Sequence, residues 1–189
     1  MNPIEHFLIG WCVANVSTEL SREERMIITA AAVAPDLDGL GMLVEIPTRN
    51  TSYPLLWWTD YHHVLGHNVA AAFVVTVLAF ALAKRRWLTA TLALINFQLH
   101  MLGDIVGARG PDGYQWPIPY FFPFSRTPEL AWDGQWALNA WPNFVITGIA
   151  LMITFFLAWS RGYSPLEIVS QKADQAFVRT LRARFSKAA

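Results

Sequence analysis

The chain has 189 residues, of which 54% are hydrophobic and only 15% are charged. An average soluble domain carries about 25% charged residues, so the deficit favours a protein with a lipid-facing surface. Basic and acidic residues number 14 each, so only the distribution of charge can indicate an anionic partner. The single cysteine, Cys12, excludes an internal disulfide. The length is that of one domain, or two at most, and is sufficient to bury a core.

Two short apolar helices are predicted first. Residues 4–16 are apolar nearly all round, which is typical of a buried helix. Ser21 and Glu24 have the spacing of a capping box, so a second helix is expected from about Arg22 until Pro35 ends it. Both helices are short for crossing a bilayer alone.

A turn with two carboxylates follows the second helix. Asp36 and Asp38 lie between Pro35 and Gly39. Because Asp and Gly are ordinary turn residues, a solvated turn is the simplest interpretation of this stretch alone, and a pair of metal ligands is the alternative. Residues 40–60 are expected to form an irregular loop or a short helix near the lipid interface.

Two segments of membrane-spanning length come next. Residues 64–83 and 87–107 are largely apolar and flank the basic turn at residues 84–86, so they predict a helical hairpin. Polar side chains inside such segments are costly, and they usually face the protein interior and serve a function. Here they are His67, Asn68, Asn96, Gln98, His100 and Asp104.

A long aromatic connection at residues 107–142 precedes a third apolar segment at residues 144–159. Connections of this length are uncommon and are often functional. The favoured interpretation is a belt of aromatic side chains at the membrane interface. A cleft that binds an acyl chain is the alternative.

The tail from Pro165 combines an apolar stripe at helical spacing with an excess of basic residues. It is expected to be an amphipathic helix on an anionic membrane face, with a plain surface helix as the alternative. A nucleic-acid partner is less expected, because the regular apolar stripe dilutes the basic residues. The predicted organisation is therefore all-α, with a membrane-embedded helical bundle over residues 1–160 and a basic amphipathic tail over residues 161–189.

Threading these helices up and down brings distant polar residues to one end of the bundle. His100 and Asp104 are four apart, so they share one helical face. For each histidine taken alone, a core or capping role is the favoured explanation, but the convergence of all seven residues indicates a metal site. The candidate ligands are His6, Asp36, Asp38, His62, His67, His100 and Asp104.

Seven imidazole and carboxylate ligands suit two divalent ions, with zinc favoured and manganese or iron as alternatives. Such a pair would activate water for attack at a phosphoryl or carbonyl group. Glu5, beside His6, is the candidate base or supporting acceptor, and His63 is the candidate donor to a leaving group or substrate phosphate.

Lysine and arginine are distributed unequally between the two ends. The ligand end has Arg49, Arg109 and Arg126, and the other 11 of the 14 basic residues belong to the opposite end or the tail. The positive-inside rule then predicts a multi-pass protein with cytoplasmic basic turns and C-terminus, and a site that opens on the outer side.

Five short motifs carry a resemblance to a known family. They read Glu5-His6-Phe7-Leu8-Ile9-Gly10, Pro35-Asp36-Leu37-Asp38, His62-His63-Val64-Leu65-Gly66-His67, His100-Met101-Leu102-Gly103-Asp104 and Phe122-Pro123-Phe124-Ser125. In this order and spacing the chain resembles the bacterial membrane-bound, metal-dependent hydrolases, also described as LexA-binding, inner-membrane-associated hydrolases. The resemblance implies a hydrolase of the bacterial inner membrane.

Two departures from the family pattern bear on the substrate. His63 replaces the usual Arg, and Gly66 with Asn68 replaces the usual Thr and Ser. If the Arg grips a substrate phosphate, His63 can do so only when it is protonated. A distant likeness to zinc-dependent phospholipases makes a phosphoester in a lipid headgroup a reasonable substrate class.

Three hypotheses follow. The leading one is a membrane-bound, metal-dependent hydrolase acting on a small-molecule or lipid phosphoester. The second is a membrane protein that stores, carries or senses a metal without catalysis. The third is an interaction or scaffold protein whose tail recruits a partner or membrane lipid.

Overall fold

The computed structural model describes residues 1–185, and over this range the chain forms helices and irregular segments without β-strands. The all-α prediction is confirmed; Lys187, one of the basic tail residues, lies outside the described range. The elements are α1 (Pro3–Ala14), α2 (Arg22–Val33), η1 (Pro35–Gly41), α3 (Met42–Thr48), α4 (Trp57–Tyr61), α5 (Val69–Leu82), α6 (Arg86–Gly107), α7 (Trp141–Arg161), η2 (Pro165–Ile168) and α8 (Gln171–Phe185), where η denotes a 3₁₀-helix.

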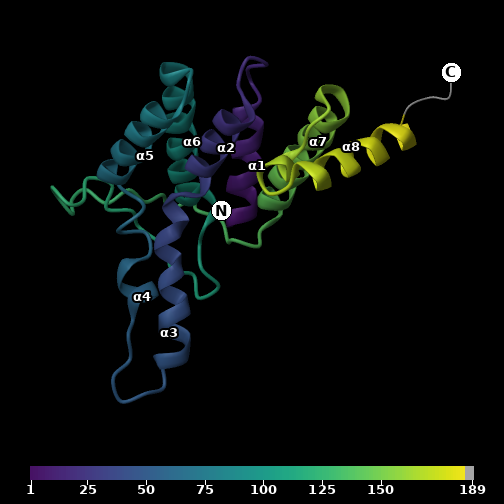
Figure 1. Ribbon diagram of the computed structural model, residues 1–189. Coiled ribbons are helices and arrows are strands. Elements are labelled where there is room, and N and C mark those ends of the chain that lie inside the picture. Colours follow the sequence, from purple (N-terminus) through teal and green to yellow (C-terminus); the bar gives the residue numbers. More distant parts are fainter. Residues whose placement is uncertain (186–189) are drawn as a thin grey trace.

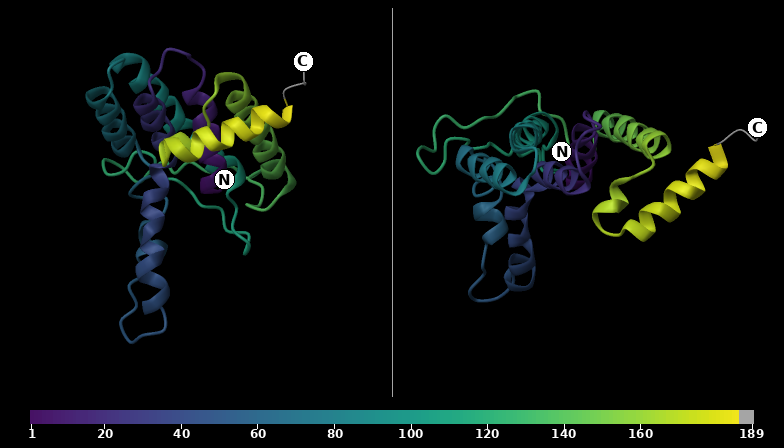
Figure 2. Two further views of the ribbon diagram at one scale, coloured as in Figure 1. Left: turned by 45° about the vertical axis from the view of Figure 1, so that its right-hand side comes forward. Right: turned by 45° about the horizontal axis from the view of Figure 1, so that its top comes forward.

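The helices α1, α2, α5 and α6 pack side by side, with α2 in contact with each of the other three. A hairpin of α3 and α4 projects from one end of this bundle, and the α6–α7 connection crosses the same end (Figure 1). α7 packs against α1, and α8 runs outward from there in both views of Figure 2. The up-and-down arrangement thus places the start of α1, the end of α2, the approach to α5 and the end of α6 at one pole.

Side-chain caps fix where the first two helices begin. The side chain of Asn2 accepts from the N–H of Glu5, whose carboxylate accepts from the N–H of Asn2. Ser21 and Glu24 form the predicted capping box of α2. Each box satisfies N–H groups that the first helical turn leaves without a partner.

Close helix crossings hold the bundle together. A Cβ at Gly10 would lie 2.4 Å from the Cβ of Ala32, so only glycine allows α1 and α2 to approach this closely. The amide of Asn96 on α6 donates to the carbonyls of Gly10, at 3.1 Å, and Ile28, at 2.8 Å. One buried amide therefore ties α6 to both α1 and α2.

The expected turn after α2 is the 3₁₀-helix η1, which continues directly into α3. Within residues 40–60 the two short helices α3 and α4 form, and Glu45 fastens them together. Its carboxylate accepts from the N–H and Oγ of Thr59, each at 2.8 Å, and from Arg49 at 2.6 Å.

The first expected span is wrong in its boundaries. The helix begins at Val69 rather than near residue 64, because Asn68 caps it by accepting from the N–H of Ala71. The 14 residues of α5 extend about 21 Å, less than the ~30 Å hydrocarbon core of a bilayer. Residues 64–68 instead form a turn that carries His67 toward α6.

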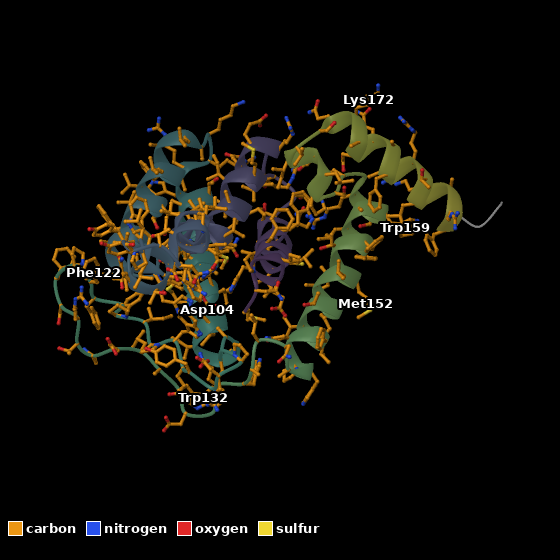
Figure 3. All side chains as sticks on the ribbon, turned by 90° about the horizontal axis from the view of Figure 1, so that it is seen from below. Asp104, Phe122, Trp132, Met152, Trp159 and Lys172 are labelled. Carbon is orange, nitrogen blue, oxygen red and sulfur yellow. The ribbon has the colours of Figure 1, made fainter. Side chains whose placement is uncertain are left out.

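By length and composition, α7 is the one helix of the described chain that can cross a membrane alone. The bent pair of α2 with η1 and α3 would give a second span if both halves cross together. Many apolar side chains of α7 are exposed; Met152, labelled in Figure 3, is 66% exposed. An exposed apolar surface is present, and its contact with lipid and the multi-pass arrangement stay predictions.

The aromatic connection divides between two environments. Phe124 and Trp132 are exposed, as a membrane belt requires, whereas Ile118 is fully buried against the bundle. Trp116 packs against the rings of His62 and His63. The connection is therefore only partly a surface belt, because its middle covers the pole where the histidines lie.

The tail does not form one continuous helix from Pro165. The helix α8 starts at Gln171, and its Val178 and Leu181 are buried, with Phe177 packed edge-to-face on Phe155 of α7. Part of the predicted stripe therefore packs on protein rather than facing lipid, while Val169 and Phe185 remain exposed.

Candidate metal centre

Three elements deliver four side chains to one point. η1 supplies Asp36, the turn ahead of α5 supplies His67, and the last two turns of α6 supply His100 and Asp104. One nitrogen or oxygen of each side chain lies within 4.8 Å of one atom of every other. In Figure 3 Asp104 lies near the centre of the molecule, in a dense group of polar side chains.

The spacing of these atoms matches the coordination shell of a small divalent ion. His67 Nε2 and His100 Nε2 are 3.2 Å apart, and Asp104 Oδ2 lies 3.3 and 3.0 Å from them, respectively. Asp36 Oδ1 completes the group at 3.6 Å from His100 Nε2 and 4.0 Å from His67 Nε2. Tetrahedral zinc with bonds of about 2.0–2.1 Å holds its ligands about 3.3 Å apart.

Hydrogen bonds behind the two imidazoles direct their free lone pairs into the group. The Nδ1–H of His100 donates to the carbonyl of Ala32 at 2.7 Å, because a carbonyl can only accept. The Nδ1–H of His67 donates to Asp38 Oδ2 at 3.0 Å. When neutral, each ring presents an unprotonated Nε2, the arrangement usual for histidines that bind metals.

Asp38 supports the site rather than completing this group of four. Its carboxylate accepts from His62 Nδ1 at 2.8 Å, from the N–H of Gly66 at 2.9 Å and from His67. Burial alone would raise the pKa of Asp38, but the hydrogen bonds from His62 and His67 hold it far below the usual value. Asp38, His62 and His67 form a second, three-residue group that shares His67 with the first.

Gly66 allows the histidine turn to reach η1. A Cβ at this position would lie 2.1 Å from the carbonyl oxygen of Pro35. A larger residue would force the turn and η1 apart, so glycine permits the observed approach.

Two buried carboxylate oxygens in the cluster lack hydrogen-bond partners. They are Asp36 Oδ2 and Asp104 Oδ2. Leaving a buried anionic oxygen without a partner costs several kcal/mol by order of magnitude, whereas a bound cation satisfies it. The donor types, their spacing and these two oxygens therefore fit a divalent ion, and nitrogen and oxygen ligands without thiolate favour zinc, manganese or iron.

The other predicted ligand, His6, lies against the group without joining it. Its Nε2 is 3.1 Å from Asp104 Oδ1, and its ring stacks on His100 with the centroids 3.6 Å apart. It thus holds the oxygen of Asp104 that faces away from the four-residue group. A second ion, as two-ion coordination requires, stays a prediction.

His67 carries an additional proton when no metal is bound. Burial alone would lower its pKa, but the adjacent carboxylates of Asp104 and Asp38 raise it to about 9. At neutral pH the imidazolium thus supplies positive charge between two carboxylates. A metal ion must displace this proton to reach Nε2.

His63 lies beside the group with an unusual backbone. Its φ is +66°, in the left-handed region, and its buried Nδ1 has no partner. Burial and the neighbouring charge of His67 lower the pKa of His63 to about 3. His63 is therefore neutral at physiological pH, which argues against its acting as a cationic substitute for the family's Arg.

Glu5, the second catalytic candidate, has a different set of partners. One oxygen belongs to the capping box of α1, and the other accepts from Oγ1 of Thr147 on α7 at 2.9 Å. One oxygen thus caps α1 and the other joins α1 to α7. These contacts favour a structural role for Glu5 over that of a base.

Three neighbours of the cluster were not among the predicted site residues. Trp58 stacks on His62, four positions later, so helical spacing was a usable signal. Trp116 contacts His62 and His63, and Gln135 donates to the backbone carbonyl of Asp104 at 2.8 Å. The last two come from the long connection, where no local pattern reveals the contact.

Comparison with known proteins identifies the family. Searches of curated proteins and of solved structures return no match. The sequence profile of one family, described as YdjM inner membrane protein, matches residues 1–174. This confirms the inner-membrane part of the resemblance and does not address hydrolase activity. The chain belongs to the YdjM inner membrane protein family.

Proposed function

We propose that the protein is a membrane-bound, metal-dependent hydrolase acting on a phosphoester. The observation that carries the proposal is the group of Asp36, His67, His100 and Asp104, whose free nitrogen and oxygen atoms lie at the spacing of a metal coordination shell. When bound, a divalent ion would polarise the phosphoryl group and lower the pKa of water.

The chain's own residues would hold and orient the reacting groups. Asp38 and the Ala32 carbonyl fix the two ligand imidazoles. Asp36 is the least buried of the four ligands, with a side chain that is 17% exposed, and it lines a cavity. A substrate would therefore approach from the Asp36 side, where His62 and His63 also line the cavity. Neutral His63 can exchange a hydrogen bond with a leaving group there.

Activity measurements on detergent-purified protein test this function. Metal-loaded protein should hydrolyse at least one member of a panel of phosphomonoesters, phosphodiesters and phospholipids, and removal of the metal should abolish turnover. His100→Ala should lose activity, whereas a matched change of an exposed polar residue, Gln175→Ala on α8, should retain it. Turnover that is unaffected by both chelation and His100→Ala would refute the assignment.

A non-catalytic metal-binding role is the second candidate. It is favoured by the number of protein ligands, because four ligands without an open position are typical of structural zinc sites. Stoichiometric metal binding without turnover of any substrate in the panel would support this candidate over the hydrolase.

A further inference from the structure

A cavity of about 460 Å³ adjoins the candidate metal centre. Its walls come from the start of the chain, η1, α3, α4 and the α6–α7 connection. Ligand sites for small molecules commonly measure about 300–1,000 Å³. The cavity is thus large enough for a substrate portion that extends beyond the reacting group.

The cavity is lined by a few polar side chains of the candidate site and otherwise mainly by apolar side chains. Asp36, His62 and His63 line the polar wall, so a ligand in the cavity lies directly beside the metal centre. The remaining lining includes Leu40, Met42, Trp58, Pro111, Trp116 and Leu138. Such a division suits an amphipathic molecule with its polar end toward Asp36.

The charges of the lining oppose a highly anionic ligand. Within residues 1–185, neither lysine nor arginine lines the cavity; the charged groups of its lining residues are the carboxylate of Asp36 and the amino group of Met1, which already pairs with Asp104. Nucleotides and sugar phosphates carry several charges and are usually held by basic side chains or helix N-termini. Removing an anionic group from water without a basic partner costs free energy, whereas an uncharged, apolar group gains free energy when it is buried.

The cavity is continuous with an exposed apolar stripe. Leu40 is both a lining residue and 56% exposed, and Leu43 and Ile46 follow at three-residue spacing on α3, at 73% and 61% exposed. In a protein of an inner-membrane family, this stripe offers a path along which a lipid chain can leave the bilayer and enter the cavity.

We propose that this cavity binds the hydrocarbon chain of a phospholipid, with Trp58 and Trp116 as its aromatic wall and the phosphoester at the Asp36 end. The substrate class rests on the proposed hydrolase function, and occupation of the cavity by lipid does not. Trp58 and Trp116 pack edge-to-face with their centroids 4.9 Å apart. Such a wall presents large apolar area at a low cost in side-chain entropy.

Photo-crosslinking tests the proposal directly. The full chain is reconstituted into vesicles of phosphatidylethanolamine and phosphatidylglycerol that contain a trace of phosphatidylglycerol with a diazirine in its acyl chain. After illumination, peptide mass spectrometry locates the adducts. Adducts are expected at Leu40, Met42 and Trp116 in the cavity, and at Met152 on the exposed face of α7 from bulk lipid.

A cavity-filling variant provides the decisive comparison. Leu138→Trp places a larger side chain in the lining, so cavity adducts should be lost while Met152 labelling persists. Leu151→Trp, on α7, changes a leucine of similar exposure outside the cavity and should leave both signals intact.

Labelling at Met152 without cavity adducts in the wild type would overturn the proposal, as would cavity adducts that persist in Leu138→Trp. Metal content and turnover are measured on the same samples. Cavity adducts without turnover would refute the hydrolase and leave the lipid site standing, whereas turnover without cavity adducts would do the reverse. Trp116→Ala, which removes half of the aromatic wall without adding volume, gives a second test by reduced labelling if Leu138→Trp fails to fold.

Discussion

Two buried polar clusters lie at opposite ends of α2, and they differ in how completely their atoms are paired. Near its start, Arg25 donates to both oxygens of Glu167, at 2.8 and 2.9 Å, and to the carbonyl of Leu20, and its guanidinium lies over the ring of Tyr163. Beyond its end, Asp36 and Asp104 each keep a buried oxygen without a hydrogen-bond partner.

The difference separates a structural ion pair, near the start of α2, from a candidate binding site beyond its end. The Arg25–Glu167 pair joins η2, and with it the tail, to the bundle, and its charges cancel within the protein. The histidine–aspartate cluster instead directs two imidazole nitrogens and two carboxylates at one point. A divalent cation would occupy both imidazole nitrogens and the unpaired carboxylate oxygens at once, so the two clusters should respond differently to substitution.

The largest expected effect is on metal binding. Asp104→Asn removes a ligand that contacts both imidazoles, so the metal dissociation constant should rise by more than the ~100-fold that loss of an outer-shell partner produces. Isothermal titration of the purified variant measures this, with Asp133→Asn in the exposed connection as the matched control. Wild-type affinity in Asp104→Asn would contradict the ligand assignment.

Disruption of the Arg25–Glu167 ion pair should lower the stability of the fold and leave metal affinity unchanged. Arg25→Met leaves Glu167 buried and unpaired, which should cost about 3–5 kcal/mol of unfolding free energy. The double variant Arg25→Met/Glu167→Leu should recover most of that loss. Unfolding in detergent measures both, and equal losses in the single and double variants would show that unpaired charge is not the cause.

A smaller effect is expected from the residue that orients His67. Asp38→Asn keeps the size of the side chain but weakens its hold on the His67 and His62 rings. Metal affinity should fall about 10–100-fold while the fold is retained. A complete loss of binding, equal to that of Asp104→Asn, would instead place Asp38 among the direct ligands.

The smallest expected effect is the gradual change of metal affinity with pH. His67 has a pKa of about 9 without metal, raised above the ordinary value of 6.5, so metal must displace its proton. The apparent affinity should rise by up to about tenfold per pH unit from pH 7 and level off near pH 9. In the metal-free protein, the stabilisation from the charged ring is complete below pH 6.5 and is lost as the pH rises through 9.

Titrations in two buffers of different ionisation enthalpy should then detect about one proton released per metal bound at pH 7. Affinity that is independent of pH between 7 and 9 would show that His67 binds no proton in the metal-free state.

The sequence was sufficient to predict the helices and the pole at which their polar residues meet. Capping residues such as Ser21 and Glu24 act locally, and the alternation of helices brings Asp36, His67 and Asp104 to one end. The start of α5 was predicted five residues early, because hydrophobicity continues through residues 64–66 while Asn68 caps the helix. Hydrophobicity alone does not show that the Asn68 cap, rather than the apolar residues before it, sets where the helix starts.

Other features depend on contacts between distant segments. Asp38 was predicted as a ligand. In the structure it accepts hydrogen bonds from His62, His67 and the N–H of Gly66, and no spacing rule in the sequence reveals these contacts. Trp116 reaches the histidines through a long irregular connection with no periodic pattern. The tail's apolar stripe was predicted to face lipid, yet Phe177 packs on Phe155 and Leu181 is buried, while Arg25 fixes η2 on the bundle.

X-ray absorption at the zinc edge, on protein loaded with one equivalent of zinc, directly tests the four-residue metal site. We expect a shell of nitrogen and oxygen ligands at about 2.0–2.1 Å with the multiple-scattering signature of two imidazoles. That signature should weaken by half in His100→Ala. A shell of water oxygens without any imidazole contribution would contradict a metal site built by Asp36, His67, His100 and Asp104.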